Sequence, residues 1–329
     1  MQRGQNLVGI KYVYSFKQKG QMKIVISGSI AIDRIMVFDG LFENLIQPDK
    51  LHVLSISTLV EDLKETRGGT AGNIAYSLAL LGENPILYGA VGRKARPYMN
   101  SLKRCGVDTS HVHFSKFATA TFTVLTDKND CQVGGFYPGA MSDADSLTVK
   151  NFEDDDILMV VSAHDPKAMV RQIAECQKMD KRLFFDIGQQ ILVLDKDQLR
   201  AGIEAAELMI LNDYEMGLLQ KKTEWSLKKI TSKLRTCVVT LGGKGSMVYE
   251  NKKEYQVAAV KLDKVVDPTG AGDAFRAGFL YGYVRDWKLR KCTKLGSVVA
   301  SFCVEKHGTQ EHSFTKRKIK NRWKKTYKG

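Results

Sequence analysis

The chain contains no apolar run near the roughly 20 residues that a transmembrane helix needs, so the sequence predicts no membrane span. Its six cysteines include no CxxC pair, and no signal-peptide pattern is present. The six histidines show no metal-binding spacing such as HExxH. These absences favour a cytoplasmic protein with reduced, mostly buried thiols and no histidine-based metal centre.

Positive charge is in excess, at a formal +14, but it is concentrated at the two ends of the chain. Residues 1–22 carry four basic residues and the stretch from His312 onward carries eight, and neither stretch contains an acid. The body is therefore nearly neutral, and no basic groove for nucleic acid is predicted. A solvated basic helix over residues 314–327 is the simpler interpretation of the tail, with weak binding of polyanions as the alternative.

What is present is an alternation of strand-like and helix-like stretches from Met22 onward. The stretch 72–82 has helical spacing, NPILYGAVG (84–92) is predicted as one short strand, and the next helix is predicted to end at Gly106. Such alternation indicates an α/β fold with a mostly parallel sheet covered on both faces. Residues 1–21 are predicted to be a disordered extension outside the single domain at 22–329.

Two segments interrupt the alternation, at about 34–66 and about 118–138. Both are strand-like without intervening helices. We expect them to meet as a small β-sheet over one edge of the main sheet, where such a lid could close on a ligand.

The stretch VVDPTGAGDAFRAGFLYG (265–282) is the strongest chemical signal. Gly270, Ala271 and Gly272 form a tight turn into a helix predicted to begin at Asp273. Glycines let an anion reach the unpaired N–H groups at a helix N-terminus, so a phosphate is the expected ligand. Asp273 could then remove a proton from an attacking hydroxyl, or it could simply cap the helix.

Three other stretches carry weaker signals. RGGTAGN contains a glycine pair and Asn73 at a helix start, TLGGKGS follows a strand, and NDYE (Asn212–Glu215) follows another strand. Ligands gather at such strand ends in open α/β sheets, and glycines let a nucleotide lie across the backbone. Loops and helix caps are the ordinary alternatives.

Taken in this order, the four stretches resemble the ribokinase-type (PfkB) family of carbohydrate and nucleoside kinases over about 22–314. SGSIAIDRIM, FYPGAMSDA and HGTQEH narrow the resemblance to bacterial adenosine kinases of the mycobacterial type. The resemblance implies a ribokinase-like fold, a central mostly parallel sheet flanked by helices with a small β-sheet lid. It also implies phosphoryl transfer from ATP to the 5′-hydroxyl of adenosine, giving AMP and ADP, as in purine salvage.

Site residues follow from the resemblance position by position. It implies Asp273 as the catalytic base and Gly270, Ala271 and Gly272 as the anion hole. It implies nucleoside contacts at Ser29, Asp33, Ser57, Gly69, Asn73, Phe122, Phe136, Gln189 and Gln190. It implies ATP contacts at Asn212, Thr240, Gly242 and Gly245, Mg²⁺ held through water by Asn212 and Glu215, and a monovalent cation, K⁺, at Asp267 and Thr269. A homodimer formed through the lid is also implied, with no membrane and no specific nucleic-acid partner.

The chemistry of these residues suits those roles. One carboxylate such as Asp33 can accept hydrogen bonds from two vicinal ribose hydroxyls. Phe122 and Phe136 could sandwich a purine, although packing within the lid would also explain them. The Gln189–Gln190 amides match the edges of a purine, which a sugar kinase would not need. Another nucleoside or a sugar such as ribose is the nearest alternative substrate. A catalytically silent nucleotide-binding protein and a polyanion-binding protein are the more distant alternatives.

Overall fold

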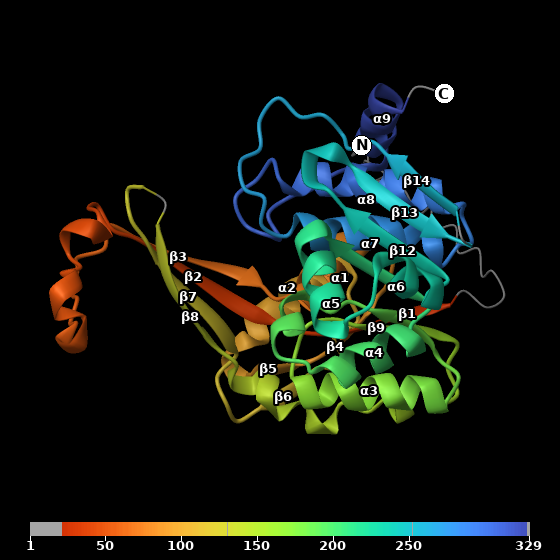
Figure 1. The fold of residues 1–329 in the computed structure, drawn as a ribbon, viewed down its shortest axis with the longest axis horizontal. Coiled ribbons are helices and arrows are strands. Elements are labelled where there is room, and N and C mark those ends of the chain that lie inside the picture. Colours follow the sequence, from red (N-terminus) through yellow and green to blue (C-terminus); the bar gives the residue numbers. More distant parts are fainter. Residues whose placement is uncertain (1–21, 130, 252, 328–329) are drawn as a thin grey trace, which may run out of the picture.

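The computed structural model describes residues 22–129, 131–251 and 253–327, so the predicted disordered extension at 1–21 lies outside the described residues. Within them, the main sheet has eight strands in the order β14-β13-β12-β11-β10-β9-β1-β4 (Figure 1). The strands from β4 to β12 are parallel, and β13 is antiparallel to both of its neighbours. Their bounds are β1 Lys23–Ser27, β4 Ile86–Tyr88, β9 Ile157–Val161, β10 Arg182–Phe185, β11 Leu208–Asn212, β12 Thr236–Thr240, β13 Ser246–Glu250 and β14 Lys253–Val257.

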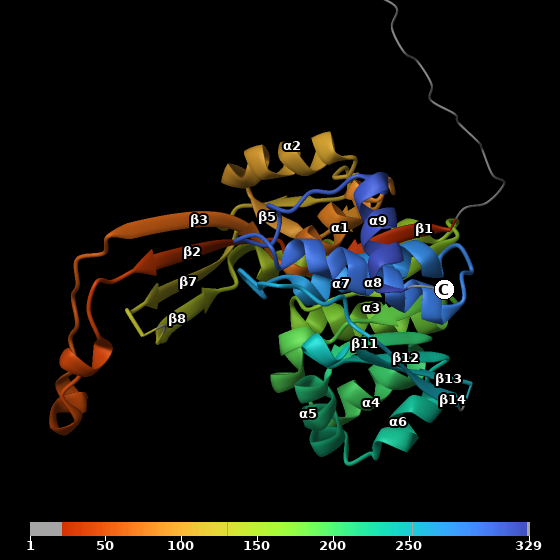
Figure 2. The same ribbon diagram turned by 90° about the horizontal axis from the view of Figure 1, so that it is seen from above.

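Helices cover both faces of this sheet, as Figure 2 shows from above. One layer contains α1 (Thr70–Leu80), α2 (Arg96–Cys105), α7 (Ala271–Tyr283), α8 (Leu289–Cys303) and α9 (Lys316–Thr326). The other contains α3 (Pro166–Lys178), α4 (Lys196–Ala205), α5 (Asp213–Thr223) and α6 (Leu227–Lys233). Successive residues of a strand point to opposite faces, so the apolar run of β9 supplies Leu158 to one core and Met159 to the other. The predicted α/β fold is confirmed.

The stretch NPILYGAVG was predicted as one strand and is two. Gly89 separates β4 in the main sheet from β5 (Ala90–Gly92), which pairs with β6 (His113–Ser115) in a sheet of its own. A Cβ on Gly89 would lie 2.9 Å from the carbonyl oxygen of Gly28, so the backbones approach closely where the chain changes direction. Apart from Gly89 the run from Ile86 to Val91 is apolar or aromatic throughout, and one glycine does not by itself reveal a change of sheet, which explains the wrong prediction.

A four-stranded sheet protrudes from the body, with the order β3-β2-β7-β8 (Figure 1). Its strands are β2 (Ala31–Val37), β3 (Asp62–Gly68), β7 (Ala120–Thr126) and β8 (Gln132–Tyr137). Parallel pairing of β2 with β7 joins the two segments that interrupt the alternation of the sequence. Between β2 and β3, residues 38–61 form an arm beyond the end of the sheet, which contains the short 3-10 helices η1 (Phe42–Asn44) and η2 (Pro48–Val53).

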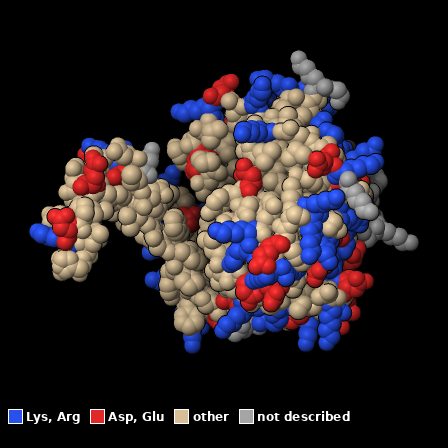
Figure 3. Space-filling view, viewed as in Figure 1, with Lys and Arg blue, Asp and Glu red and all other residues tan. Residues whose placement is uncertain are grey.

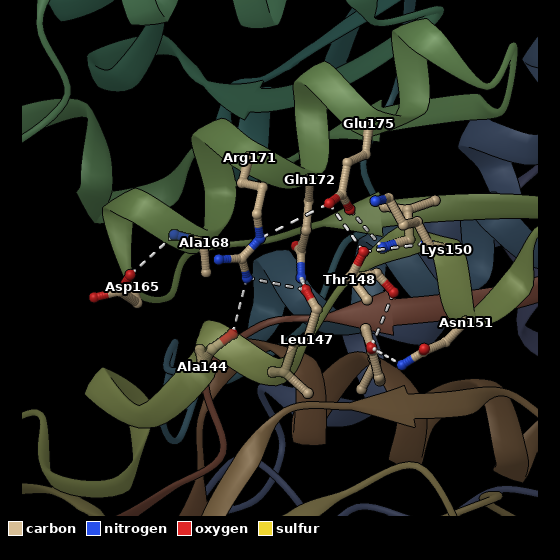
Figure 4. Close-up of polar contacts among 12 residues, drawn as sticks. Ala144, Leu147, Thr148, Lys150, Asn151, Asp165, Ala168, Arg171, Gln172 and Glu175 are labelled. Atoms are coloured by element: carbon tan, nitrogen blue, oxygen red, sulfur yellow. Dashed lines mark hydrogen bonds and ion pairs between the residues drawn. The ribbon is translucent and has the colours of Figure 1, made fainter.

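Side chains of α3 form hydrogen bonds with the segment that follows β8 (Figure 4). It turns into the 3-10 segment η4 (Gly139–Ser146), and the Gln172 side-chain amide donates to the carbonyl oxygen of Leu147 at 2.9 Å. Glu175 accepts a hydrogen bond of 2.9 Å from the hydroxyl of Thr148. These side chains on α3 hold the root of the protruding sheet in a defined position relative to the main sheet.

The basic tail forms α9, which lies on α8 by one face. Arg322 donates to both carboxylate oxygens of Glu305 at 3.0 Å, and Trp323 packs against the core of this layer. Most other basic residues of the helix are exposed, in agreement with a solvated outer face. Among the described residues, no helix is both long enough and apolar enough to cross a membrane.

Candidate active site

The turn at residues 270–272 leads directly into α7. Gly270 has φ +77° and occupies the N-cap position, so α7 begins at Ala271, two residues before the predicted start. No side chain caps this helix end, and the interpretation of Asp273 as its N-cap is therefore wrong. Asp273 lies within the first turn, beside backbone N–H groups that have no partner inside the helix.

Asp273 is held by Asn73, on the first turn of α1. The Asn73 side-chain amide donates to Asp273 Oδ2 at 2.8 Å, and its Oδ1 accepts from Thr309 Oγ1 at 2.8 Å and from Gln310 Nε2 at 2.9 Å. These contacts fix which end of the Asn73 amide faces the carboxylate. Two predicted site residues from distant parts of the chain are thus in direct contact.

Burial raises the pKa of Asp273 from 3.8 to about 6, because the surrounding protein disfavours the charged form. The charge of Arg276 and the hydrogen bond from Asn73 oppose this rise. A carboxylate with a pKa near 6 is ionised at neutral pH and is a stronger base than an ordinary aspartate. That combination suits proton abstraction from a hydroxyl.

Asp33, Phe122 and Phe136 lie side by side on one face of the protruding sheet. Asp33 on β2 is in register with Phe122 on β7, which is in register with Phe136 on β8. Residues in register on neighbouring strands share a face. The two rings remain 37% and 49% exposed, which argues against packing inside the lid as the explanation for them.

Burial raises the pKa of Asp33 to about 6, and its carboxylate makes no hydrogen bond to any described residue. The carboxylate lies against Gly68, where a Cβ would collide with it. The carbonyl oxygen of Gly68 accepts from Tyr98 at 2.9 Å, and Tyr98 in turn accepts from Gln310 at 2.5 Å. Asp33 is thereby connected through three groups to the Asn73–Asp273 pair. The surface between the protruding sheet and the body is hollowed in Figure 3.

Ser29 and Gly69 form the junction between β1 and α1. Ser29 Oγ accepts the backbone N–H of Thr70 at 3.0 Å. Gly69 has φ +88°, and a Cβ there would lie 2.5 Å from the carbonyl oxygen of Ser29. Both residues therefore have structural reasons for their identity, besides any contact with a ligand.

The two glutamines differ. Both lie on the 3-10 segment η6 (Gly188–Leu192), which follows β10 at the carboxyl edge of the sheet. Gln189 is exposed, whereas Gln190 Oε1 is buried and has no partner among the described residues. A buried polar atom without a partner costs free energy unless a ligand satisfies it, so Gln190 is a good candidate for a ligand contact.

Ser57 is not brought to this site. It is exposed and lies on the arm at residues 38–61. Both ribbon views show this arm extending away from the body (Figures 1 and 2). A contact between Ser57 and a nucleoside bound to the same chain would require the arm to move.

Asn212 and Glu215 form a capping box at the start of α5. Glu215 N–H donates to Asn212 Oδ1 at 2.7 Å, and Asn212 N–H donates to Glu215 Oε2 at 2.9 Å. The helix-cap interpretation of the NDYE stretch is correct. The Glu215 charge nevertheless acts on Asp273, whose pKa it raises. Carboxylate and amide oxygens suit Mg²⁺, although no group of three or more His, Cys, Asp or Glu among the described residues forms a metal cluster.

Thr240 is the last residue of β12, at the same edge of the sheet. Gly242 follows with φ +56°, is exposed, and has open space where a Cβ would be. Gly245 has φ +96°, and a Cβ there would collide with the carbonyl oxygen of Val257. Gly242 thus leaves a surface open to a ligand, whereas Gly245 serves the turn into β13.

Asp267 is fixed in the loop before the 270–272 turn. Its carboxylate accepts from the N–H groups of Thr269 at 2.8 Å and Gly308 at 2.9 Å. Burial opposes ionisation of Asp267, but these hydrogen bonds outweigh it and hold the pKa below the ordinary value. The loop is ordered around a negative charge, which is compatible with a nearby cation.

Sequence reasoning missed several residues that organise the site. Asp186 follows buried β10 and accepts from Arg276 Nε at 2.7 Å, and both residues are buried. A carboxylate directly after an apolar strand, and an arginine inside the apolar helix sequence AFRAGF, were the available signals. Tyr98 and Gln310 had none, because their contacts depend on how α2 and the loop after α8 fold back onto α1.

Comparison with known proteins agrees with this geometry. The chain is 30% identical over 275 residues to a nucleoside kinase of Methanocaldococcus jannaschii, covering 82% of this chain and 89% of that protein. The ligand-free structure of a nucleoside kinase from Burkholderia thailandensis matches with a TM-score of 0.81 and 34% identity, over 91% of this chain and 99% of that one. The complex of the Burkholderia enzyme with inosine matches with a TM-score of 0.80 and 31% identity, over 92% and 98%.

These relatives are nucleoside kinases in general, so the narrower resemblance to mycobacterial-type adenosine kinases is not established by them. The model of the pfkB family carbohydrate kinases matches residues 23–317. This chain belongs to the pfkB family of carbohydrate kinases.

Proposed function

We propose that this protein is a nucleoside kinase that transfers the γ-phosphoryl group of ATP to the 5′-hydroxyl of adenosine, giving AMP and ADP in purine salvage. Asp273 would remove the proton of the 5′-hydroxyl. The backbone N–H groups of Gly270, Ala271 and Gly272 would stabilise the charge on the migrating phosphoryl group.

One observation carries the proposal: Asp33, Phe122 and Phe136 share a face of the protruding sheet, and Asp33 has no hydrogen-bond partner among the residues that the structure describes. A carboxylate beside two exposed rings suits a ribose joined to a flat base. A simple sugar would use the carboxylate but not the rings. Gln190 Oε1 is buried and has no partner within the described part of the chain, which supports a base with a hydrogen-bond donor such as the 6-amino group of adenosine.

Cation sites belong to the same proposal. Asn212 and Glu215 would hold Mg²⁺ through water, and Thr240, Gly242 and Gly245 would lie along ATP. Asp267 and Thr269 would hold K⁺ beside the turn. Mg²⁺, when bound, neutralises charge on the phosphates during transfer.

The remaining parts of the proposal concern the oligomeric state, the location in the cell and the closure of the protruding sheet. Uncovered apolar side chains on the protruding sheet, such as Leu63 and Val133, support a homodimer formed through it. Six free cysteines and the use of ATP support a cytoplasmic location. Closure of the protruding sheet over the nucleoside would exclude water from the reaction.

The first experiment is a panel of nucleosides and sugars with MgATP, with and without K⁺, scored by release of ADP. We expect adenosine to give the highest kcat/KM and K⁺ to increase it. A preference for inosine, with which a Burkholderia thailandensis nucleoside kinase forms a complex in a solved structure, would support nucleoside kinase activity but reject adenosine as the substrate. Preference for ribose would reject the proposed role of the two phenylalanines.

The second experiment replaces the base. Asp273→Asn should lower kcat by about 10²- to 10⁴-fold while leaving the Kd for adenosine nearly unchanged. Turnover equal to that of the natural protein would remove Asp273 from the mechanism. Absence of turnover with every nucleoside and sugar, before any substitution, would favour a silent nucleotide-binding protein.

A further inference from the structure

Arg276 lies directly behind the turn at residues 270–272. It is one helical turn after Asp273 on α7 and is 8% exposed. A Cβ on Gly272 would lie 2.7 Å from Arg276 Nη1, so any larger residue at 272 would collide with the guanidinium. Gly272 does not have a positive φ, and backbone conformation therefore does not require glycine there. The space that Gly272 leaves on its inner side is occupied by this cation.

Two bonds fix the guanidinium in this place. Nε donates to Asp186 Oδ1 at 2.7 Å, and Nη2 donates to the carbonyl oxygen of Ile210 at 3.1 Å. Asp186 is 1% exposed, and its Oδ2 accepts from Ser162 Oγ at 2.7 Å. The ion pair therefore connects the carboxyl ends of β9 and β10, and the middle of β11, to the first turns of α7. Nη1, which faces Gly272, makes no hydrogen bond with a described residue.

Two carboxylates and one cation act on the charge of Asp273. Asp186 after β10 and Glu215 on α5 are carboxylates, and Arg276 is the cation that offsets them. The remaining groups that face Asp273 are neutral: the Asn73 amide on α1, the Tyr98 phenol on α2 and the Cys303 thiol on α8. Burial alone would lower the pKa of Arg276, but Asp186, Asp273 and Glu215 raise it, so the guanidinium stays charged.

We propose that Arg276, anchored by Asp186, is a positioning residue that keeps Asp273 ionised at neutral pH from behind the 270–272 turn. It acts through Asp273 and through the backbone of the turn, and it touches neither substrate. The consequence for catalysis rests on the proposed function, whereas the effect on the Asp273 carboxyl does not.

The test is a titration of the Asp273 carboxyl by carbon NMR in the full-length, ligand-free protein labelled at aspartate. The Asp273 signal is identified by its absence in Asp273→Asn. We expect a midpoint near pH 6 in the natural protein. Arg276→Met should raise the midpoint by about one pH unit or more, because it removes an opposite charge. Arg276→Lys, which keeps the charge, should leave the midpoint close to the natural value.

Arg276→Gln, a second neutral variant, replaces Arg276→Met if that variant does not fold. Asp186→Asn gives the opposite sign, because asparagine Oδ1 can still accept from Arg276 Nε. It removes a carboxylate near Asp273 and keeps the cation, so the midpoint should fall. An unchanged midpoint in folded Arg276→Met or folded Arg276→Gln would overturn the proposal.

Activity provides the second readout. The acid limb of the kcat/KM profile should move with the carboxyl midpoint, upward in Arg276→Met and downward in Asp186→Asn. If the natural protein phosphorylates no nucleoside, the proposed function fails while the NMR titration still tests Arg276. If the nucleoside is phosphorylated and the midpoints do not move, only the role of Arg276 fails.

Discussion

Replacing Asp273 by asparagine should make the folded protein more stable at neutral pH. Burial raises the pKa of this carboxyl from 3.8 to about 6 in the folded protein. The folded protein therefore binds more protons than the unfolded chain between about pH 4 and pH 6. Over that range, stability falls as the pH rises, and above it the ionised carboxylate imposes its full cost. Asparagine cannot ionise and escapes that cost.

The magnitude follows from the size of the pKa change. A difference of about two pH units is worth about 3 kcal/mol, and this value already includes the attraction of Arg276. Asp273 is half-buried, so solvent screening reduces the figure, and we expect a gain of about 1–3 kcal/mol at pH 7.5. The asparagine Oδ1 can still accept from Asn73, so the hydrogen bond is retained.

The assay is urea denaturation of the natural protein and Asp273→Asn at pH values from 4 to 8. The difference in unfolding free energy should be about 1–3 kcal/mol at pH 7.5 and should vanish near pH 4. Asp263→Asn, an exposed site with the same change in net charge, is the matched control and should show little difference. Equal stability of Asp273→Asn and the natural protein at every pH would refute the claim that the ionised Asp273 carboxylate destabilises the folded protein.

Three further outcomes are expected. Gly69→Ala should lower the unfolding free energy, measured in urea, by at least about 2 kcal/mol, because the methyl group would collide with the Ser29 carbonyl oxygen. The control Gly82→Ala has a similar φ of +92° but open space around the new methyl group, so it should lower the unfolding free energy by only about 1 kcal/mol. Phe122→Ala should raise the KM for adenosine by about 5- to 150-fold with little change in kcat, whereas Phe117→Ala, outside the sheet face, should leave the KM unchanged. Adenosine should slow proteolysis near Asp127, and equal cleavage with and without it would contradict closure of the protruding sheet.

The order of strands and helices could be predicted because the local patterns are strong. The buried run of β9 and the αL glycine at the end of α2 are determined by residues close in sequence. The same holds for the glycine turn before Asp273. The Gly89 break between β4 and β5 was missed because it depends on how closely Gly28 approaches, and Gly28 is about 60 residues away.

The contacts within the site were harder to predict because they join distant parts of the chain. Asn73 and Asp273 were each identified as candidates, but their bond spans 200 residues and no local pattern encodes it. The register that aligns Asp33 with Phe122 depends on parallel pairing between β2 and β7, which are separated by several other elements. The resemblance assigned both residues to nucleoside binding, and the register shows that they share a face of the sheet. Ser57, whose role rested on the resemblance alone, is the residue that the structure leaves apart.

The two glycines of the GAGD stretch are required for different structural reasons. Gly270 needs its positive φ, and a Cβ there would lie 2.9 Å from the Thr309 methyl group, so its identity is required by the turn itself. Gly272 has an ordinary φ and is exposed on its outer side, where an anion could approach. Its inner side is filled by Arg276 Nη1. Gly272 therefore leaves room for the buried guanidinium of Arg276 as well as for a ligand on its outer side. The proposed phosphate-facing surface and the charge around Asp273 therefore meet at Gly272.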